Sequence, residues 1–231
     1  MQNKTYEKHE FNVQGKRITL YPSITVDKPV IYLNTFENEG ERVLAAVRER
    51  CAADFTLVAI GGLNWDHDMS PWSMPPLFKG DAPCTGGADE YLRLLTEQIA
   101  PRAEELVKGR AAWSGLAGYS LAGLFALYAL YQSPFFSRVA SVSGSLWFAN
   151  FKEFALTHEM KAPPECVYFS LGDKECMAKN PVLQSVQENT EQIAQFYAHS
   201  GIQTTFELNE GNHFQNAIQR TAAGIAWLLG R

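Results

Sequence analysis

The sequence predicts an α/β fold in which a mostly parallel central sheet is covered by helices on both faces. Continuously apolar segments of strand length alternate with helical segments along the chain. Strands that are apolar on both faces are typical of a parallel sheet buried between two helical layers. The length of 231 residues fits a single domain, 1–231, since α/β domains often reach about 200–250 residues.

The expected first element is an antiparallel hairpin at the N-terminal end. Residues 10–13 and 17–21 alternate apolar and polar side chains around Gln14, Gly15 and Lys16, a pattern typical of two strands joined by a tight turn. Further strands are predicted at 29–33, 55–60, 112–119, 139–142, 167–171 and 204–208. The helices predicted between and after them cover 41–51, 89–107, 121–131, 181–199 and 214–229.

One predicted helix has no charged residue on any side. It covers 121–131, whereas the other helical segments carry Glu, Lys or Arg. A helix that is apolar all round is buried all round, and Gln132, Ser133 and Pro134 are expected to end it. This helix is therefore expected at the centre of the fold, directly after the strand at 112–119.

Composition and charge narrow the classes of partner. The chain has 20 basic and 25 acidic residues, a net charge of −5 and no dense Lys/Arg cluster, so nucleic acids and anionic membranes are not expected partners. The longest apolar run is far shorter than the roughly 20 residues of a membrane span, and residues 1–10 lack a signal-peptide pattern. Cys51, Cys84, Cys166 and Cys176 form no C-x-x-C pair and no metal spacing, which predicts free thiols in a cytoplasmic protein. Composition and charge do not determine the oligomeric state.

A serine nucleophile is predicted where the strand at 112–119 meets the apolar helix. The junction reads Gly-Tyr-Ser-Leu-Ala-Gly over 118–123, so Ser120 has a small residue two positions away on either side. This pattern is typical of a nucleophile elbow, a strained turn that exposes the serine hydroxyl. The Leu121 N–H would lie at the positive end of the helix, where it can stabilise an oxyanion. The alternative is an ordinary N-cap serine.

A histidine base and a carboxylate are expected after the serine, in the chain order Ser, acid, His that accompanies a nucleophile elbow. His213 follows the last predicted strand, at the sheet edge where Ser120 emerges, and is the predicted base. Asp173 and Glu175 both follow the strand at 167–171, and either could orient the His213 imidazole. Spacing alone leaves both carboxylates open.

Three segments of the chain resemble the putative-esterase branch of the α/β-hydrolase superfamily, which includes esterase D-like enzymes and the catalytic domains of enterochelin esterases. They read Gly-Tyr-Ser-Leu-Ala-Gly-Leu at 118–124, Ser-Leu-Gly-Asp-Lys-Glu at 170–175 and Gly-Asn-His-Phe at 211–214. The resemblance implies an α/β-hydrolase fold with Ser120 as nucleophile, His213 as base and Glu175, rather than Asp173, as acid. It also implies a second oxyanion donor at Leu63 or a neighbour. A serine-hydrolase mechanism on these residues requires no cofactor.

Tryptophans are expected to form the walls of the substrate pocket. Trp65 and Trp72 share one polar and aromatic loop, and the alternative is that these two side chains only pin that loop. The segment 143–147, which follows the strand at 139–142 and ends with Trp147, is a further candidate wall. Residues 71–87, rich in proline and small residues, predict a flap over the site, and no large lid insertion is present. The Asp-His-Asp run at 66–68 lacks a fourth ligand, so no metal is expected there.

The predicted function is hydrolysis of a small carboxylic ester through an acyl-enzyme on Ser120. A small-molecule ester is the expected partner, and the lack of a lid insertion favours an accessible site. Two alternatives stay open: an acyltransferase or thioesterase that uses the same residues, and a non-catalytic binding protein that keeps the fold.

Overall fold

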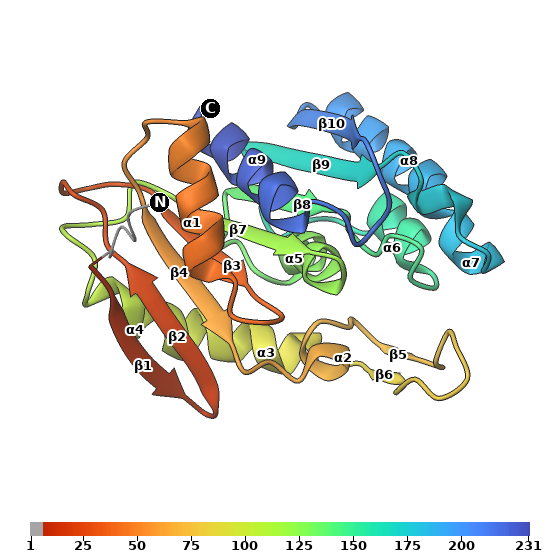
Figure 1. Ribbon diagram of the computed structural model, residues 1–231, viewed down its shortest axis with the longest axis horizontal. Coiled ribbons are helices and arrows are strands. Elements are labelled where there is room, and N and C mark those ends of the chain that lie inside the picture. Colours follow the sequence, from red (N-terminus) through yellow and green to blue (C-terminus); the bar gives the residue numbers. More distant parts are fainter. Residues whose placement is uncertain (1–6) are drawn as a thin grey trace.

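The computed structural model describes residues 7–231, and its central feature is an eight-stranded sheet (Figure 1). The strand order is β1-β2-β4-β3-β7-β8-β9-β10. The strands are β1 His9–Val13, β2 Lys16–Tyr21, β3 Val30–Asn34, β4 Thr56–Gly61, β7 Ser114–Tyr119, β8 Arg138–Val142, β9 Cys166–Gly172 and β10 Gln203–Asn209. All neighbouring strands from β4 to β10 in this order pair in parallel. The strands β1 and β2 form an antiparallel hairpin, and β2 also pairs antiparallel with β4. The predicted α/β fold is confirmed.

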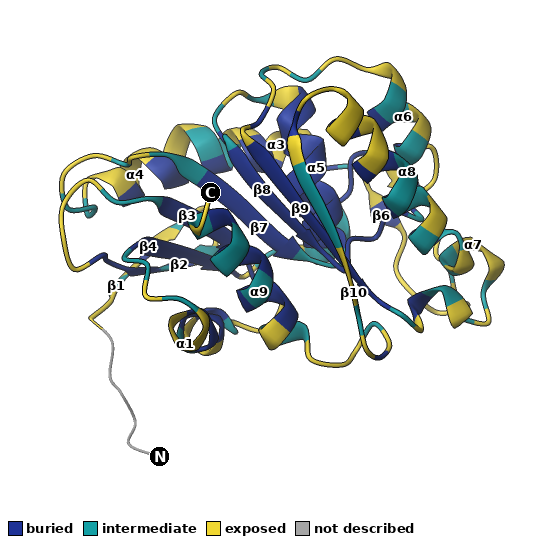
Figure 2. Cartoon of the chain, turned by 90° about the horizontal axis from the view of Figure 1, so that it is seen from above, coloured by how far each residue is buried: buried dark blue, intermediate teal, exposed yellow. Residues whose placement is uncertain are grey.

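Helices cover both faces of the sheet (Figure 2). The helices α1 (Gly40–Arg50) and α9 (Ala217–Leu229) pack against one face and against each other. The other face is covered by α3 Ala88–Leu94, α4 Ala100–Glu104, α5 Leu121–Gln132, α6 Phe151–Thr157 and α8 Val186–His199. Each face buries its own apolar cluster, and the larger one lies under α5. Among residues 7–231, no helix combines the length and apolar character needed to cross a membrane.

The uncharged helix α5 lies at the centre of the larger cluster, as its composition predicts. Every residue from Leu121 to Tyr131 is buried, and α5 packs against β7 and β8. The helix leaves β7 through Ser120 alone. The Ser120 turn, at the edge of the sheet, is therefore anchored by the deeply buried helix that follows it.

The helix expected at 89–107 is interrupted. It runs as α3, then as a π-helical turn at Leu95–Ile99, then as α4. Within this turn the Ala100 N–H donates to the Leu95 carbonyl, five residues earlier. Pro101 follows directly, and in a regular helix its ring would meet the carbonyl of Glu97. The widened turn relieves that clash, which is a usual origin of such bulges.

Several short elements of the structure are absent from the predicted pattern. They are α2 Trp65–Asp68, β5 Ser73–Met74, β6 Cys84–Thr85, α6 and the 3-10 turn Glu175–Met177. The helix expected at 181–199 is divided at Ser185 into α7 Pro181–Gln184 and α8. The pair β5 and β6 forms an antiparallel hairpin that extends away from the sheet beyond α2 (Figure 1). This hairpin occupies the segment expected to be a flap. Such short elements depend on tertiary contacts rather than on periodicity.

Candidate active site

The turn between β7 and α5 has the strained backbone of a nucleophile elbow. Ser120 has φ 61° and ψ −125°, which an L-residue adopts only at a cost, and such strain concentrates at functional sites. A Cβ on Gly118 would lie 2.2 Å from the Ala122 carbonyl oxygen, so only glycine fits there. Because Gly118 has no side chain, the turn accommodates the methyl group of Ala122, which is fully buried.

Ser120, His213 and Glu175 form a continuous hydrogen-bonded row at this edge of the sheet. The Ser120 Oγ lies 3.0 Å from His213 Nε2, and His213 Nδ1 lies 2.7 Å from Glu175 Oε2. The three side chains come from the ends of three parallel strands, β7, β10 and β9. The carboxyl ends of parallel strands meet at one edge of the sheet, which explains why residues so distant in sequence come together.

The Glu175 carboxylate is buried and fully partnered. Its Oε1 accepts hydrogen bonds from Ser143 Oγ at 2.8 Å, from the Gly172 N–H at 2.7 Å and from Arg220 Nη1 at 3.1 Å. Burial raises the pKa of Glu175, but hydrogen bonds to its charged form and the neighbouring His213 outweigh burial and hold the pKa below its usual range. Glu175 is therefore ionised, as a group that stabilises an imidazolium must be.

Asp173, the other carboxylate left open by spacing, has a different partner. Its Oδ1 accepts the N–H of Gly211 at 2.8 Å. Gly211 has φ 106°, a conformation that favours glycine, and it belongs to the loop that carries His213. The structure thus places Glu175 against the imidazole of His213 and Asp173 against the backbone of the same loop.

Two further side chains brace the His213 loop. The Tyr119 hydroxyl donates to the His213 carbonyl at 2.6 Å, and Arg220 Nη2 donates to the Glu210 carbonyl at 2.9 Å. Tyr119 and Arg220 were not singled out from the sequence, although an arginine in the otherwise uncharged segment Ala217–Leu229 was a usable signal. Arg220 is 2% exposed, and a buried cation is retained only where it has partners.

Two serines near the row were also not assigned a role. Ser143, with φ 44°, donates to Glu175. Ser145 Oγ lies 3.3 Å from Ser120 Oγ, and the Ser145 N–H donates to the Ser120 carbonyl at 3.1 Å. The segment at 143–147 therefore supports both the acid and the turn of Ser120, whereas its sequence indicated only a pocket wall.

The predicted oxyanion donors lie on two different elements. Leu121 is the first residue of α5, where a backbone N–H has no acceptor within the helix. Leu63 follows β4, is half-buried and packs against the larger apolar cluster. The N–H of Asn64, one residue further, donates to Asp68 Oδ2 at 2.7 Å.

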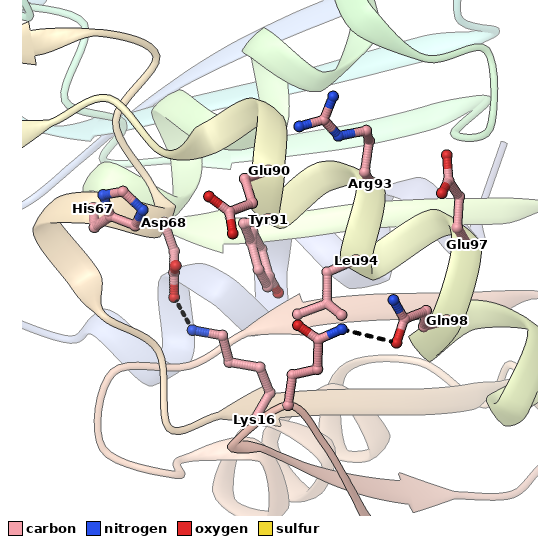
Figure 3. A pocket seen from close by; sticks show the side chains of 10 residues that line it. Lys16, His67, Asp68, Glu90, Tyr91, Arg93, Leu94, Glu97 and Gln98 are labelled. Carbon is pink, nitrogen blue, oxygen red and sulfur yellow. Dashed lines mark hydrogen bonds and ion pairs between the residues drawn. The ribbon is translucent and has the colours of Figure 1, made fainter.

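The same Asp68 oxygen also binds the Lys16 ammonium, and both residues line a cavity (Figure 3). Lys16 comes from β2 and Asp68 from α2, so the pair joins the N-terminal hairpin to the loop after β4. Both side chains are largely buried, and the Tyr91 ring lies beneath the ammonium. The pair restrains the segment that carries Leu63.

A cavity of about 270 Å³ adjoins Leu121. Its lining includes Trp147, one of the predicted walls, and residues of the β5–β6 hairpin, the predicted flap. Trp72, another predicted wall, is not among the lining residues. Its Nε1 donates to the Ala149 carbonyl at 2.9 Å, and its ring packs against Tyr128, Phe148, Phe151 and Phe154. Trp72 therefore anchors its own loop and does not form a wall of this cavity, because these rings enclose its indole.

Trp65 packs edge-to-face on Phe36 with ring centroids 5.0 Å apart, and it is not among the residues that line this cavity. The side chains of the neighbouring residues 66–68 point to three different surroundings. Asp66 lines the cavity, His67 Nδ1 lies 2.7 Å from Thr85 Oγ1 at the base of the hairpin, and Asp68 faces Lys16. Within the described part of the chain, no three His, Cys, Asp or Glu side chains are grouped to hold a metal ion.

A mostly parallel sheet with a strained serine turn and a histidine on the loop after the last strand defines an α/β-hydrolase. The chain belongs to the putative esterase family, whose model matches residues 33–223. It is 26% identical to the uncharacterized protein YbbA of Bacillus subtilis, and the alignment covers 96% of each chain.

Solved structures share the fold over nearly the whole chain. The siderophore hydrolase EstA of Aspergillus nidulans has a TM-score of 0.75 at 20% identity, covering 100% of this chain and 97% of that one. An IroE-like serine hydrolase of Shewanella oneidensis has a TM-score of 0.77 at 18% identity, covering 98% and 80%. The resemblance inferred from the three sequence segments is confirmed at the level of family and fold.

Proposed function

We propose that this protein is a serine hydrolase that cleaves a carboxylic ester through an acyl-enzyme on Ser120. The observation that carries the proposal is the row from Ser120 Oγ to His213 Nε2 at 3.0 Å and from His213 Nδ1 to Glu175 Oε2 at 2.7 Å. A serine hydroxyl is a weak nucleophile at neutral pH unless a base within hydrogen-bond reach takes its proton. The two distances support His213 as that base and Glu175 as the group that orients it.

In the first half of the reaction, the Ser120 oxygen attacks the ester carbonyl while His213 Nε2 takes the hydroxyl proton. The negative charge that develops on the carbonyl oxygen is stabilised by the backbone N–H of Leu121 and of Leu63. The ionised Glu175 stabilises the imidazolium of His213 without itself taking the proton. Collapse of the tetrahedral intermediate breaks the ester C–O bond, and the departing alkoxide receives the proton from His213.

In the second half, water attacks the acyl-enzyme and His213 takes its proton. The new tetrahedral intermediate releases the carboxylic acid, and the proton returns to the Ser120 oxygen. The His213 side chain is 29% exposed, so water can reach its ring. That exposure is compatible with water as the acceptor of the acyl group.

The substrate class that we propose is a small ester, with siderophore esters among those to be tested. Support comes from the family description and from the names of relatives with the same fold, which include siderophore and enterobactin hydrolases. A stretch covering 28% of this chain is 40% identical to a siderophore enterobactin esterase of Emericella nidulans.

The test replaces the nucleophile. We expect Ser120→Ala to lower kcat for p-nitrophenyl acetate by about 10⁴–10⁶-fold, with an unchanged circular dichroism spectrum. A fluorophosphonate probe should label the wild type at Ser120 and leave the variant unlabelled. Wild-type turnover by pure, folded Ser120→Ala would overturn the proposal. Product analysis with added alcohol would reveal a transferase if a new ester formed in place of free acid.

A further inference from the structure

The cavity beside Leu121 has apolar walls and an acidic lining. Apolar walls come from the β5–β6 hairpin (residues 74–78, Ala82 and Cys84) and from Leu121 and Trp147. The charged residues that line it are Asp66 and Asp81, and no Lys, Arg or His is among its described lining residues. Leu121, whose N–H is the proposed oxyanion donor, and two carboxylates therefore line the same cavity.

Neither carboxylate has a partner in the described part of the chain. Asp66 and Asp81 receive no hydrogen bond and form no ion pair through their side chains there, whereas Asp68, two residues from Asp66, binds Lys16. Burial, and then the charge of Asp81, raise the pKa of Asp66 above its usual range. Asp66 is half-buried and Asp81 is exposed, and both line the same cavity. A cation bound beside the two carboxylates would offset their mutual repulsion.

The two carboxylates come from different elements. Asp66 lies in α2, directly after the loop that carries Leu63, and Asp81 lies in the loop between β5 and β6. Both carboxylates line the cavity that Leu121 also lines. A substrate held with its carbonyl at the Leu121 N–H would therefore extend one arm between the hairpin and α2.

Building on the function proposed above, we propose that this cavity selects esters in which one arm has an apolar body and carries an ammonium group, and that it rejects anionic esters. The apolar walls hold the carbon chain, and Asp66 and Asp81 hold the cation. A carboxylate on the same arm would meet two like charges, which repel it, and this repulsion weakens as salt screens it. The preference for cationic over anionic esters should then appear in kcat/KM, because the charged arm of the substrate stays bound while the ester carbonyl reacts.

The experiment compares esters that differ only in the charge of one arm. The acyl-side series consists of p-nitrophenyl esters of 6-aminohexanoic acid, hexanoic acid and adipic acid. The alcohol-side series consists of acetates of 4-(trimethylammonio)butanol, butanol and 4-hydroxybutanoate, followed by pH-stat titration. We expect the wild type to favour the cationic over the anionic ester by tenfold or more in at least one series, with a preference that shrinks as salt is added.

Variants test whether the two carboxylates cause the preference. Asp66→Asn, Asp81→Asn and the double variant should reduce the ratio of cationic to anionic kcat/KM stepwise toward one. Glu49→Gln, exposed on α1 at the opposite face of the sheet, removes the same charge and should leave the ratio unchanged. Asparagine keeps the shape of aspartate, and melting temperatures would verify that the variants fold.

Two failures are distinguishable. If the wild type hydrolyses the neutral esters but shows no charge preference in either series, or a preference that the double variant retains, the charge-selective cavity is wrong and the esterase function stands. If the wild type hydrolyses no ester and Ser120 is not labelled by a fluorophosphonate, the function itself is wrong.

Discussion

The Arg220 guanidinium lies 3.1 Å from Oε1 of Glu175, the carboxylate oxygen that faces away from His213. Arg220 belongs to α9, which packs on the face of the sheet opposite to α5. It also donates a hydrogen bond to the Glu210 carbonyl in the loop that carries His213. One buried cation thus stabilises the charge of the proposed acid and the position of the loop that carries the proposed base. We regard Arg220 as a positioning residue, because it touches neither the serine nor the substrate cavity.

Removal of Arg220 should therefore damage stability and turnover together. Arg220→Met leaves Glu175 buried without its cation, and breaking a buried ion pair costs about 3–5 kcal/mol. We expect that loss in urea unfolding, together with a fall in kcat that exceeds any change in KM. Arg50→Met, at the exposed end of α1, is the matched control. Unchanged kcat in a stably folded Arg220→Met variant would contradict the positioning role.

Amide substitutions at the two carboxylates should separate their roles. Glu175→Gln keeps the shape but replaces the charge that stabilises the His213 imidazolium, so we expect kcat to fall by about 10⁴-fold, as for such a change in a serine protease. Asp173→Asn keeps an oxygen for the Gly211 N–H, and its kcat should stay within about tenfold of the wild type. Steady-state kinetics on one ester checks both. The reverse ranking would assign the acid to Asp173.

The ion pair between Lys16 and Asp68 should matter for the oxyanion loop. Asp68→Ala removes the acceptor of the Asn64 N–H and releases the segment that carries Leu63. Deleting an oxyanion donor costs about 10²–10³-fold in kcat, and we expect a smaller loss, of roughly tenfold, from loosening its support.

Lys16→Met is the comparison for this change, because it leaves the bond between Asp68 and Asn64 intact. Its kcat should fall less than that of Asp68→Ala, while KM for a small ester changes little in both. Equal losses in the two variants would show that the ion pair, rather than the Asn64 bond, restrains the loop.

Acid should weaken the protein partly through Glu175. Its folded pKa lies below its usual range, so its ionised form contributes stability above the ordinary glutamate range of about pH 4–5, and this contribution is lost as pH falls through the folded pKa. The gap in unfolding free energy between the wild type and Glu175→Gln should thus stay level from pH 7 to about pH 5 and shrink on further acidification. Urea titrations at several pH values measure the gap, with Glu49→Gln as control. A gap that is independent of pH would contradict the prediction.

The sheet and its long helices were predictable because burial imposes a pattern. Parallel strands buried on both faces are continuously apolar, and the predicted ranges at 139–142 and 167–171 differ from β8 and β9 by at most one residue at each end. The hairpin of β5 and β6 escaped prediction because it depends on contacts from outside. Its base is held by His67 on Thr85, and Gly87 leaves room for the His67 ring, which a Cβ would meet at 2.3 Å.

The sequence by itself determined the class of fold, the serine at the turn between strand and helix, and the order of the polar residues that follow it. These features are local, since each follows from the pattern of a short segment. Only the tertiary structure decided which carboxylate meets His213, that Arg220 lies behind Glu175, and that Trp72 packs among aromatic rings while Asp66 lines the cavity. The reason is physical: a side chain's partner depends on how loops from separate strands meet at the sheet edge, which local pattern does not encode.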